Sequence, residues 1–207
     1  MGAHGHTVRH RPREFDGVGY TLQLLNGSLL AELTAAQRET QQPYDACGQW
    51  AAAGRVDDEL VATLLAEPFM AIARPERTGR DLFNAPWLQA QLARSGAGLS
   101  AGDVMATLAE FTARGATEAL RRTLPSLHTL LVCGGGAFNA HLMARLSSLV
   151  PAGVEVQGTA SRGGAPDRVE ALAFAWLARE HLAGRAGNLP AVTGTRGPRV
   201  LGTLYPA

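Results

Sequence analysis

The last third of the sequence constrains the fold most, because two short apolar runs there are each followed by a helical pattern. Residues 128–133 (HTLLVC) are apolar without interruption, which is typical of a strand covered on both faces. Three glycines end this run, and a helix is predicted from Asn139. A second strand is predicted at 154–157 and a second long helix at 167–181. This order predicts a βαβα unit with a parallel pair of strands, so the chain belongs to the α/β class.

The middle of the chain carries start signals for three more helices. Acidic residues at Asp57 and the two positions after it suit the first turn of a helix, and Asn84 is a cap for a second one. Ser100 and Asp103 resemble a capping box, and the helix that follows is predicted to extend through Leu120. The large aromatic residues are expected in the core: Trp87, Phe111 and Trp176.

The first part of the chain has a weaker pattern. Residues 17–34 contain a short apolar segment, a turn and a possible helical piece, and 35–42 are polar. The polar stretch is typical of a linker or a junction between two units.

Charge and composition exclude several classes of function. The 207 residues carry 19 basic and 18 acidic side chains, so nothing electrostatic favours nucleic acid or an anionic membrane as a partner. All the basic residues are arginine, which excludes a P-loop lysine and a Schiff base. No window reaches the roughly 18 apolar residues of a membrane span. Two cysteines and no leader-like start favour the reducing cytoplasm.

The glycine run is the strongest local signal for a binding site. Glycines between a buried strand and a helix start let the backbone approach a ligand with N–H groups facing it, although a tight turn without a ligand has the same spacing. A dinucleotide fingerprint needs a third glycine where this chain has Asn139, and Glu155 meets its acidic position only loosely. A Rossmann-type oxidoreductase is therefore disfavoured.

Several motifs, in matching order along nearly the whole chain, resemble the anhydro-N-acetylmuramic acid kinase family. The segments that carry this resemblance are HGHTVRHRP (4–12), TGRDLFN (78–84), DVMATL (103–108), GGGAFNAHLMARL (134–146), DRVEALAFAWLA (167–178) and GNLPAVTG (187–194).

The resemblance implies an actin-like ATPase (ribonuclease H-like) fold with ATP between two lobes. It also implies an ATP- and Mg²⁺-dependent kinase that opens the 1,6-anhydro bond of anhydro-N-acetylmuramic acid with water. An Asp base activates that water, O6 receives the phosphoryl group, and the product is the N-acetylmuramic acid 6-phosphate of cell-wall recycling. The residues that this resemblance places at adenosine are Gly134, Gly135, Gly136 and Asn139, and those that it places at the sugar are Glu170, His4 and Thr7.

The chain also departs from the family pattern. The GTS-x-DG phosphate loop, the DFR segment with the catalytic Asp, the NIGG strand and the GPGN loop are all absent, His6 replaces a Gln, and Cys47 stands where an Asp is usual. Residues 1–38 are expected to be a remnant of the N-terminal lobe, and 39–207 the C-terminal, ATP-binding lobe. No catalytic residue and no metal ligand is assigned.

Three aspartates remain as candidate carboxylates for a phosphate-bound metal: Asp45, Asp57 and Asp58. For the last two, a place in the first turn of a helix facing solvent is the favoured interpretation. We therefore expect this chain to be inactive alone, with a small amino sugar as the family's substrate and a homodimer as a possible assembly. The alternative is a non-catalytic nucleotide-binding remnant or a partner subunit.

Overall fold

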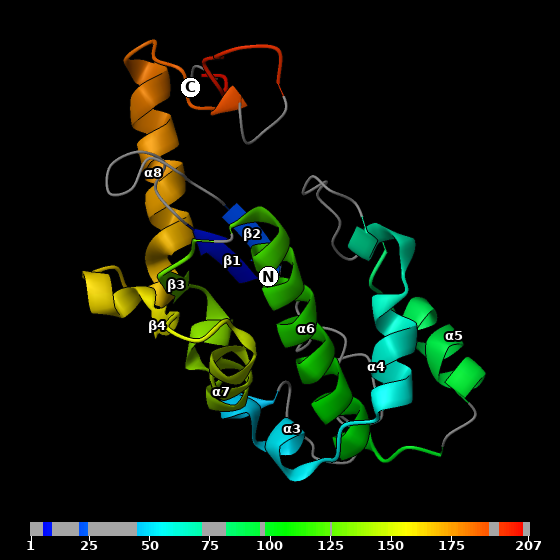
Figure 1. Ribbon diagram of the computed structural model, residues 1–207. Helices are drawn as coiled ribbons and strands as arrows, with labels where there is room; N and C mark the ends of the chain where they lie inside the picture. Colours follow the sequence, from blue (N-terminus) through cyan, green and yellow to red (C-terminus); the bar gives the residue numbers. More distant parts are fainter. Residues whose placement is uncertain are drawn as a thin grey trace.

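The computed structural model describes residues 6–9, 21–24, 45–71, 82–95, 98–124, 126–190 and 195–204, the first two ranges by their backbone alone. Its sheet contains β1 (His6–Arg9), β2 (Thr21–Leu24), β3 (Thr129–Val132) and β4 (Glu155–Gly158) in the order β2-β1-β3-β4. β1 and β2 form an antiparallel pair, and β1 joins β3 antiparallel where Val8 faces Val132. β3 and β4 are parallel, with Leu130 opposite Val156, which confirms the predicted parallel pair (Figure 1).

Helices pack against this sheet and against one another. The α-helices are α3 (Gln49–Ala53), α4 (Asp58–Leu65), α5 (Ala85–Ser95), α6 (Ala101–Thr123), α7 (Ala140–Leu149) and α8 (Val169–Leu182). Short 3₁₀ turns join them: η1 (Ala46–Gly48), η2 (Pro68–Ala71), η3 (Gly135–Phe138), η4 (Thr159–Arg162) and η5 (Pro166–Arg168). None of the helices in these described ranges is long and apolar enough to cross a membrane.

The predicted helix starts are confirmed by their hydrogen bonds. The side chain of Asp57 accepts a hydrogen bond from the N–H of Leu60 at 2.7 Å, and Asn84 accepts one from Trp87 at 2.9 Å. The hydroxyl of Ser100 accepts from the N–H of Asp103 at 3.1 Å. Each cap satisfies an N–H group that the first turn of a helix otherwise leaves without a partner.

The core lies on both sides of α6, the longest helix (Figure 1). One cluster joins α6 to β3 and α7, and the other joins α6 to α4 and α5. The first cluster contains Leu120, Leu130, Val132, Leu142 and Leu146, and the second contains Leu60, Leu64, Leu88, Leu108 and Phe111.

One core expectation was wrong and two stand. Phe111 is fully buried and Trp87 packs against the second cluster, but Trp176 is 41% exposed. Trp176 lies on α8, which extends away from the rest of the described chain, so the apolar residues of that helix have little to pack against (Figure 1).

Parts of the predicted organisation fall outside the described residues. The helical piece in 17–34 and the polar stretch 35–42 lie there, as does the boundary at residue 38. β1 and β2 belong to the segment 1–38 and pair into the same sheet as β3. The division into 1–38 and 39–207 stays a prediction.

Candidate functional site

The candidate site is the bend that follows β3. Gly134 has φ 77° and ψ −171°, a conformation that favours glycine because it has no Cβ. Its N–H donates to the carbonyl of Pro166 at 2.9 Å, and its own carbonyl accepts from Ala137 at 3.1 Å. Gly134 therefore connects the bend after β3 to η5, which leads directly into α8.

Several N–H groups along the bend have partners within the protein. Besides those of Gly134 and Ala137, the N–H of Asn139 donates to the carbonyl of Gly136 at 3.1 Å. Gly136 is buried, whereas Gly135 is exposed and Phe138 is 56% exposed. The expectation of a row of N–H groups open to a ligand is thus wrong for Gly134 and Asn139, and the open part of the bend is at Gly135 and Phe138.

Asn139 caps the helix after the bend. Its side chain accepts a hydrogen bond from the N–H of Leu142 at 2.8 Å. Gly48 lies directly against this cap with φ 75°, and a Cβ there would overlap the Asn139 amide and lie 2.8 Å from the Cβ of His141. The segment before α3 and the start of α7, almost a hundred residues apart, are therefore packed together, and only glycine fits at position 48.

Cys47 is exposed and has a left-handed backbone, with φ 57°. Asp and Asn tolerate this conformation better than other residues that carry a Cβ. An Asp at this position is therefore easier to accommodate than the Cys of this chain.

The three candidate aspartates serve the fold. Asp45 is buried, and its two carboxylate oxygens accept from the N–H groups of Trp50 at 2.9 Å and Ala51 at 3.1 Å. Asp57 caps α4, and Asp58 binds Arg114 at 2.9 Å. Within the described ranges no three His, Cys, Asp or Glu side chains are grouped so that they could hold a metal ion. The residues described here therefore do not fit a Mg²⁺–phosphate site.

The described part of the chain does not bring together the amino acids that are expected to bind the sugar. Glu170 lies exposed in the first turn of α8, close in sequence to Pro166. Thr7 lies in β1, where only the backbone is described, and its partner in the sheet is Gln23. His4 lies outside the described residues.

Two buried polar atoms near the bend were missed by sequence reasoning. Thr159 follows the last residue of β4, and its hydroxyl oxygen is buried without a hydrogen-bond partner among the described residues. The Nε2 atom of His141, in the first turn of α7, is in the same situation. The position of Thr159 at the carboxyl end of a parallel strand, where open α/β sheets bind ligands, was the available signal.

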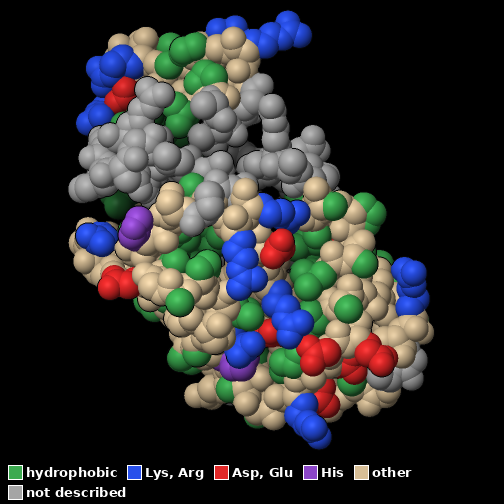
Figure 2. Space-filling model, in the orientation of Figure 1, with side chains coloured by type: hydrophobic (Ala, Val, Ile, Leu, Met, Phe, Trp, Pro, Cys, Tyr) green, Lys and Arg blue, Asp and Glu red, His purple; other side chains and the backbone are tan. Residues whose placement is uncertain are grey.

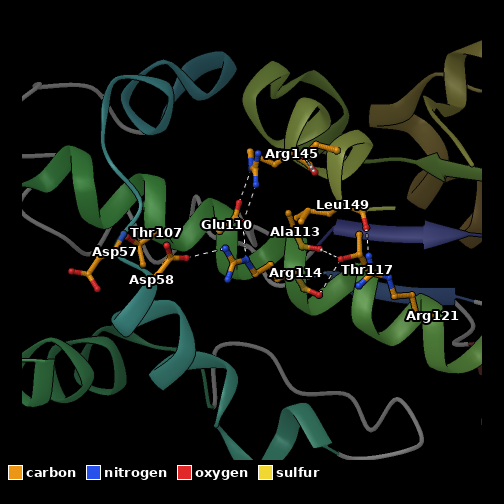
Figure 3. Close-up of polar contacts among 11 residues, drawn as sticks. Asp57, Asp58, Thr107, Glu110, Ala113, Arg114, Thr117, Arg121, Arg145 and Leu149 are labelled. Atoms are coloured by element: carbon orange, nitrogen blue, oxygen red, sulfur yellow. Dashed lines mark hydrogen bonds and ion pairs between the residues drawn. The ribbon is translucent and has the colours of Figure 1, made fainter. Parts of the chain in front are cut away.

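A buried ionic cluster on α6 was also missed (Figure 3). The Glu110 side chain is 1% exposed, and it accepts from Arg145 at 2.6 and 3.0 Å and from Arg114 at 2.7 Å. Burial raises the pKa of Glu110, but the hydrogen bonds and charges of Arg145 and Arg114 outweigh burial and hold that pKa below its usual range. The spacing of Glu110 and Arg114 on one helix predicts that pair, whereas nothing in the sequence indicates Arg145.

A pocket opens beside this cluster, between α6, the end of α4 and the end of α7. Three arginines line it, and two of them donate to backbone carbonyls: Arg121 to Leu149 at 2.7 Å and Arg122 to Met70 at 3.1 Å. Glu118 lies 4.0 and 3.8 Å from the same two arginines. These groups hold helix ends together, and their charges are partly compensated within the protein.

Comparison with known proteins identifies the family. Its sequence profile, described as anhydro-N-acetylmuramic acid kinase, matches residues 34–207. A protein of that name from Variovorax paradoxus is 41% identical over 284 residues, which cover all of this chain and 75% of the relative. One from Albidiferax ferrireducens is 36% identical over 299 residues, covering all of this chain and 76% of the relative. One from Xanthomonas oryzae pv. oryzae is 52% identical over 172 residues, which cover 83% of this chain and 45% of the relative.

The lengths of these matches agree with the predicted internal deletion. The Variovorax match extends over 284 residues although this chain has 207, so at least 77 positions of that relative face gaps in this chain. The Xanthomonas match covers 83% of this chain with 172 residues and therefore contains practically no gap. On the profile match and on these relatives, the chain belongs to the anhydro-N-acetylmuramic acid kinase family.

Proposed function

We propose that this chain is the nucleotide-binding lobe of an actin-like sugar kinase and that the adenosine of ATP lies at the bend formed by Gly134, Gly135 and Gly136. The observation that carries this proposal is the place of the bend, at the carboxyl end of β3 beside its parallel neighbour β4. Ligands of open α/β sheets bind at such ends. Family membership supports ATP as the ligand.

The side chains around the bend suit a nucleoside. Gly135 is exposed and has no side chain to keep a ligand away, and the half-exposed Phe138 offers an aromatic face on which a base can stack. The buried hydroxyl of Thr159, which has no partner in the described ranges, is a donor for a ribose or base oxygen. The side-chain carbonyl oxygen of Asn139 caps α7, and its side-chain NH₂ group is the part that we propose for a ligand.

The reaction we propose for the family's full-length site is the ring opening and phosphorylation of anhydro-N-acetylmuramic acid. ATP supplies the phosphoryl group to O6, and water adds to the anomeric carbon. Glu170, His4 and Thr7 are the residues that we propose for the sugar. The three aspartates that could have held Mg²⁺ have structural roles, and we propose that this chain alone binds nucleotide without turnover.

Two assays test this proposal together. Coupled ADP release with the anhydro-sugar is expected to show no turnover, and calorimetry is expected to show nucleotide binding. Turnover at the rate of a full-length relative would contradict the loss of activity. Absence of any binding would contradict the adenosine site.

A matched pair of glycine variants tests the bend itself. Gly135→Ala is expected to weaken nucleotide binding about tenfold or more, because the new methyl group keeps the ligand from the backbone. Gly98→Ala is the control, since a Cβ at Gly98 meets nothing within 4 Å. Equal affinity of the two variants would remove the bend as the binding site.

The second candidate, a remnant that pairs with a full-length subunit, is favoured by the same observations on the aspartates. It differs in its outcome, because activity would appear only when both chains are mixed. We also propose a cytoplasmic location and a homodimer.

A further inference from the structure

The pocket beside the ionic cluster of α6 is separate from the bend after β3. Its lining comes from α6, from the end of α4, from Met70 in η2 and from Leu149, the last residue of α7. The bend lies at the other end of α7, where Asn139 caps the helix. A helix of 10 residues is about 15 Å long. A ligand of this pocket is therefore different from the ligand proposed for the bend.

The size of the pocket suits a small molecule. Its volume is about 480 Å³, and small-molecule sites have volumes of roughly 300–1,000 Å³. Gly115 contributes to its shape, because a Cβ at this position would lie 2.6 Å from the Cε atom of Met70. Glycine is unfavourable in the middle of a helix. At this position it leaves room for Met70 to lie against α6 and to form part of the pocket wall.

Arginines supply the positive charge of the pocket. Arg121 and Arg122 follow Arg114 after seven and eight positions on α6, so all three lie on one side of that helix. Figure 2 shows basic side chains in a row over the middle of the molecule, with acidic side chains between them. A guanidinium group offers several N–H donors in a planar fork, and this fork matches the oxygens of an anion.

Most of these donors are not used within the described part of the chain. There, the side chain of Arg121 makes one hydrogen bond, to the carbonyl of Leu149 at 2.7 Å. Among the same residues, the side chain of Arg122 also makes one, to the carbonyl of Met70 at 3.1 Å. Both arginines are thus held in place by a backbone carbonyl and retain N–H groups for a ligand.

Glu118 brings a carboxylate to the same pocket, but it competes weakly for these donors. Its oxygens lie 4.0 Å from Nη1 of Arg121 and 3.8 Å from Nε of Arg122, which is longer than a hydrogen bond. Its side chain is 55% exposed, and exposed pairs at this spacing on a helix stabilise little. An anion with better geometry therefore displaces Glu118 into solvent without breaking a hydrogen bond between these side chains.

We propose that this pocket binds a phosphate monoester that carries an apolar group. A phosphate monoester has about two negative charges near neutral pH and several acceptor oxygens, and arginine binds such oxygens with paired N–H···O bonds. The lining also contains Leu65, Met70 and Leu149, which offer an apolar contact to the rest of the ligand. The proposal does not depend on the proposed function, since none of the described lining residues belongs to the bend.

Calorimetric titration of the full chain with phenyl phosphate tests this proposal. We expect Arg121→Gln to weaken binding about tenfold or more, because it removes the charge but retains an N–H donor for the carbonyl of Leu149. Arg94→Gln is the matched control: Arg94 is an exposed arginine on α5 that does not line the pocket, and its substitution is expected to leave binding unchanged. Gly135→Ala, in the bend, is expected to leave it unchanged as well.

A second variant should have the opposite effect, which a defect in folding does not produce. Glu118→Gln is expected to strengthen the binding of phenyl phosphate several-fold, because it removes the competing negative charge and nearly conserves the size of the side chain. Inorganic phosphate is expected to bind more weakly than phenyl phosphate, since it makes no apolar contact.

Four results would overturn the proposal. They are the absence of phenyl phosphate binding at millimolar concentration, equal affinities of Arg121→Gln and Arg94→Gln, weaker binding by Glu118→Gln, and loss of binding in Gly135→Ala, which would assign the ligand to the bend. Equal affinities for phenyl phosphate and inorganic phosphate would overturn the role of the apolar wall.

Discussion

α6 and α8 are both rich in apolar residues and both lie in the region that matches the family profile, yet their surroundings are opposite. On α6, Leu108 and Phe111 are at most 1% exposed, because helices and strands cover the helix on two sides. On α8, large side chains such as Phe174 are more exposed than buried. Apolar composition alone therefore does not determine burial; the presence of a partner element does.

The ionic contacts of the two helices differ in the same way. Glu110 of α6 is bound by Arg145, which is 35 residues away on α7, and shares Arg114 with Asp58 of α4 (Figure 3). Among the residues that the structure describes, Glu180 of α8 is bound only by arginines one and five residues away. The cluster on α6 joins three helices, whereas the cluster on α8 stabilises only its own end of the chain.

The largest expected effect comes from removing one aromatic ring from each of the two helices and comparing the losses in stability. Phe111→Ala should lower the free energy of unfolding by about 3–5 kcal/mol, since it opens a cavity between α4, α5 and α6. The ring centroid of Phe111 lies 6.0 Å from that of Phe83 and 6.2 Å from that of Trp87, and these contacts are lost too. Phe174→Ala should change the free energy by less than about 0.5 kcal/mol in the dilute monomer.

Urea denaturation of both variants at the same low protein concentration measures this difference. Leu65→Met, a substitution that nearly conserves volume at a half-buried position, serves as the control for general disturbance of the core. A loss of several kcal/mol in the Phe174 variant would show that α8 is covered in solution and would remove the contrast between the helices.

The ionic cluster of Glu110 on α6 is expected to contribute measurably to the free energy of unfolding. Glu110→Gln should cost about 2 kcal/mol, because two arginines lose their carboxylate but remain partly exposed to water. The pKa of Glu110 is lowered in the folded protein, so its contribution is complete above the ordinary value of 4.5 and is lost as the pH falls through the lowered pKa. The unfolding free energy of the natural chain should therefore decrease in this acidic range more steeply than that of the variant.

Glu180→Gln is the comparison on α8. Arg185, with help from Arg179, lowers the pKa of Glu180 to about 2, yet this ion pair joins only neighbouring residues and its partners are exposed. We expect no measurable loss of global stability at neutral pH. If the two Glu variants unfold with the same midpoint in urea, the cluster on α6 has no special role.

The features predicted from the sequence share one property, which is that neighbouring residues determine them. The caps at Asp57, Asn84 and Ser100 depend on N–H groups three residues away, and the strands before and after α7 are short apolar runs bounded by turn residues. The bend at Gly134 was found for the same reason, because its left-handed backbone favours glycine.

The features that were missed depend on residues far apart in the chain. The antiparallel contact of Val8 with Val132 joins the first residues of the chain to β3, and no local pattern encodes it. Arg145 was not recognised as a partner of Glu110 because its helix reaches α6 only after the chain has passed through the sheet. The exposure of Trp176 was missed because an apolar helix has the same sequence pattern whether or not a partner is present.

The smallest expected effect compares how the two helices begin. Ser100 caps α6 and also donates to the carboxylate of Asp103 at 2.7 Å, whereas Arg168, at the start of α8, makes no capping hydrogen bond with its side chain. Ser100→Ala should therefore lower the free energy of unfolding by about 1 kcal/mol, and Ser100→Asn, which keeps an acceptor, should restore most of this loss. Arg168→Ala should be neutral or slightly stabilising, since it removes a positive charge from the positive end of a helix. Urea midpoints of the three variants measure these changes, and a loss in the Arg168 variant as large as that in Ser100→Ala would mean that α8 depends on its first turn as much as α6 does.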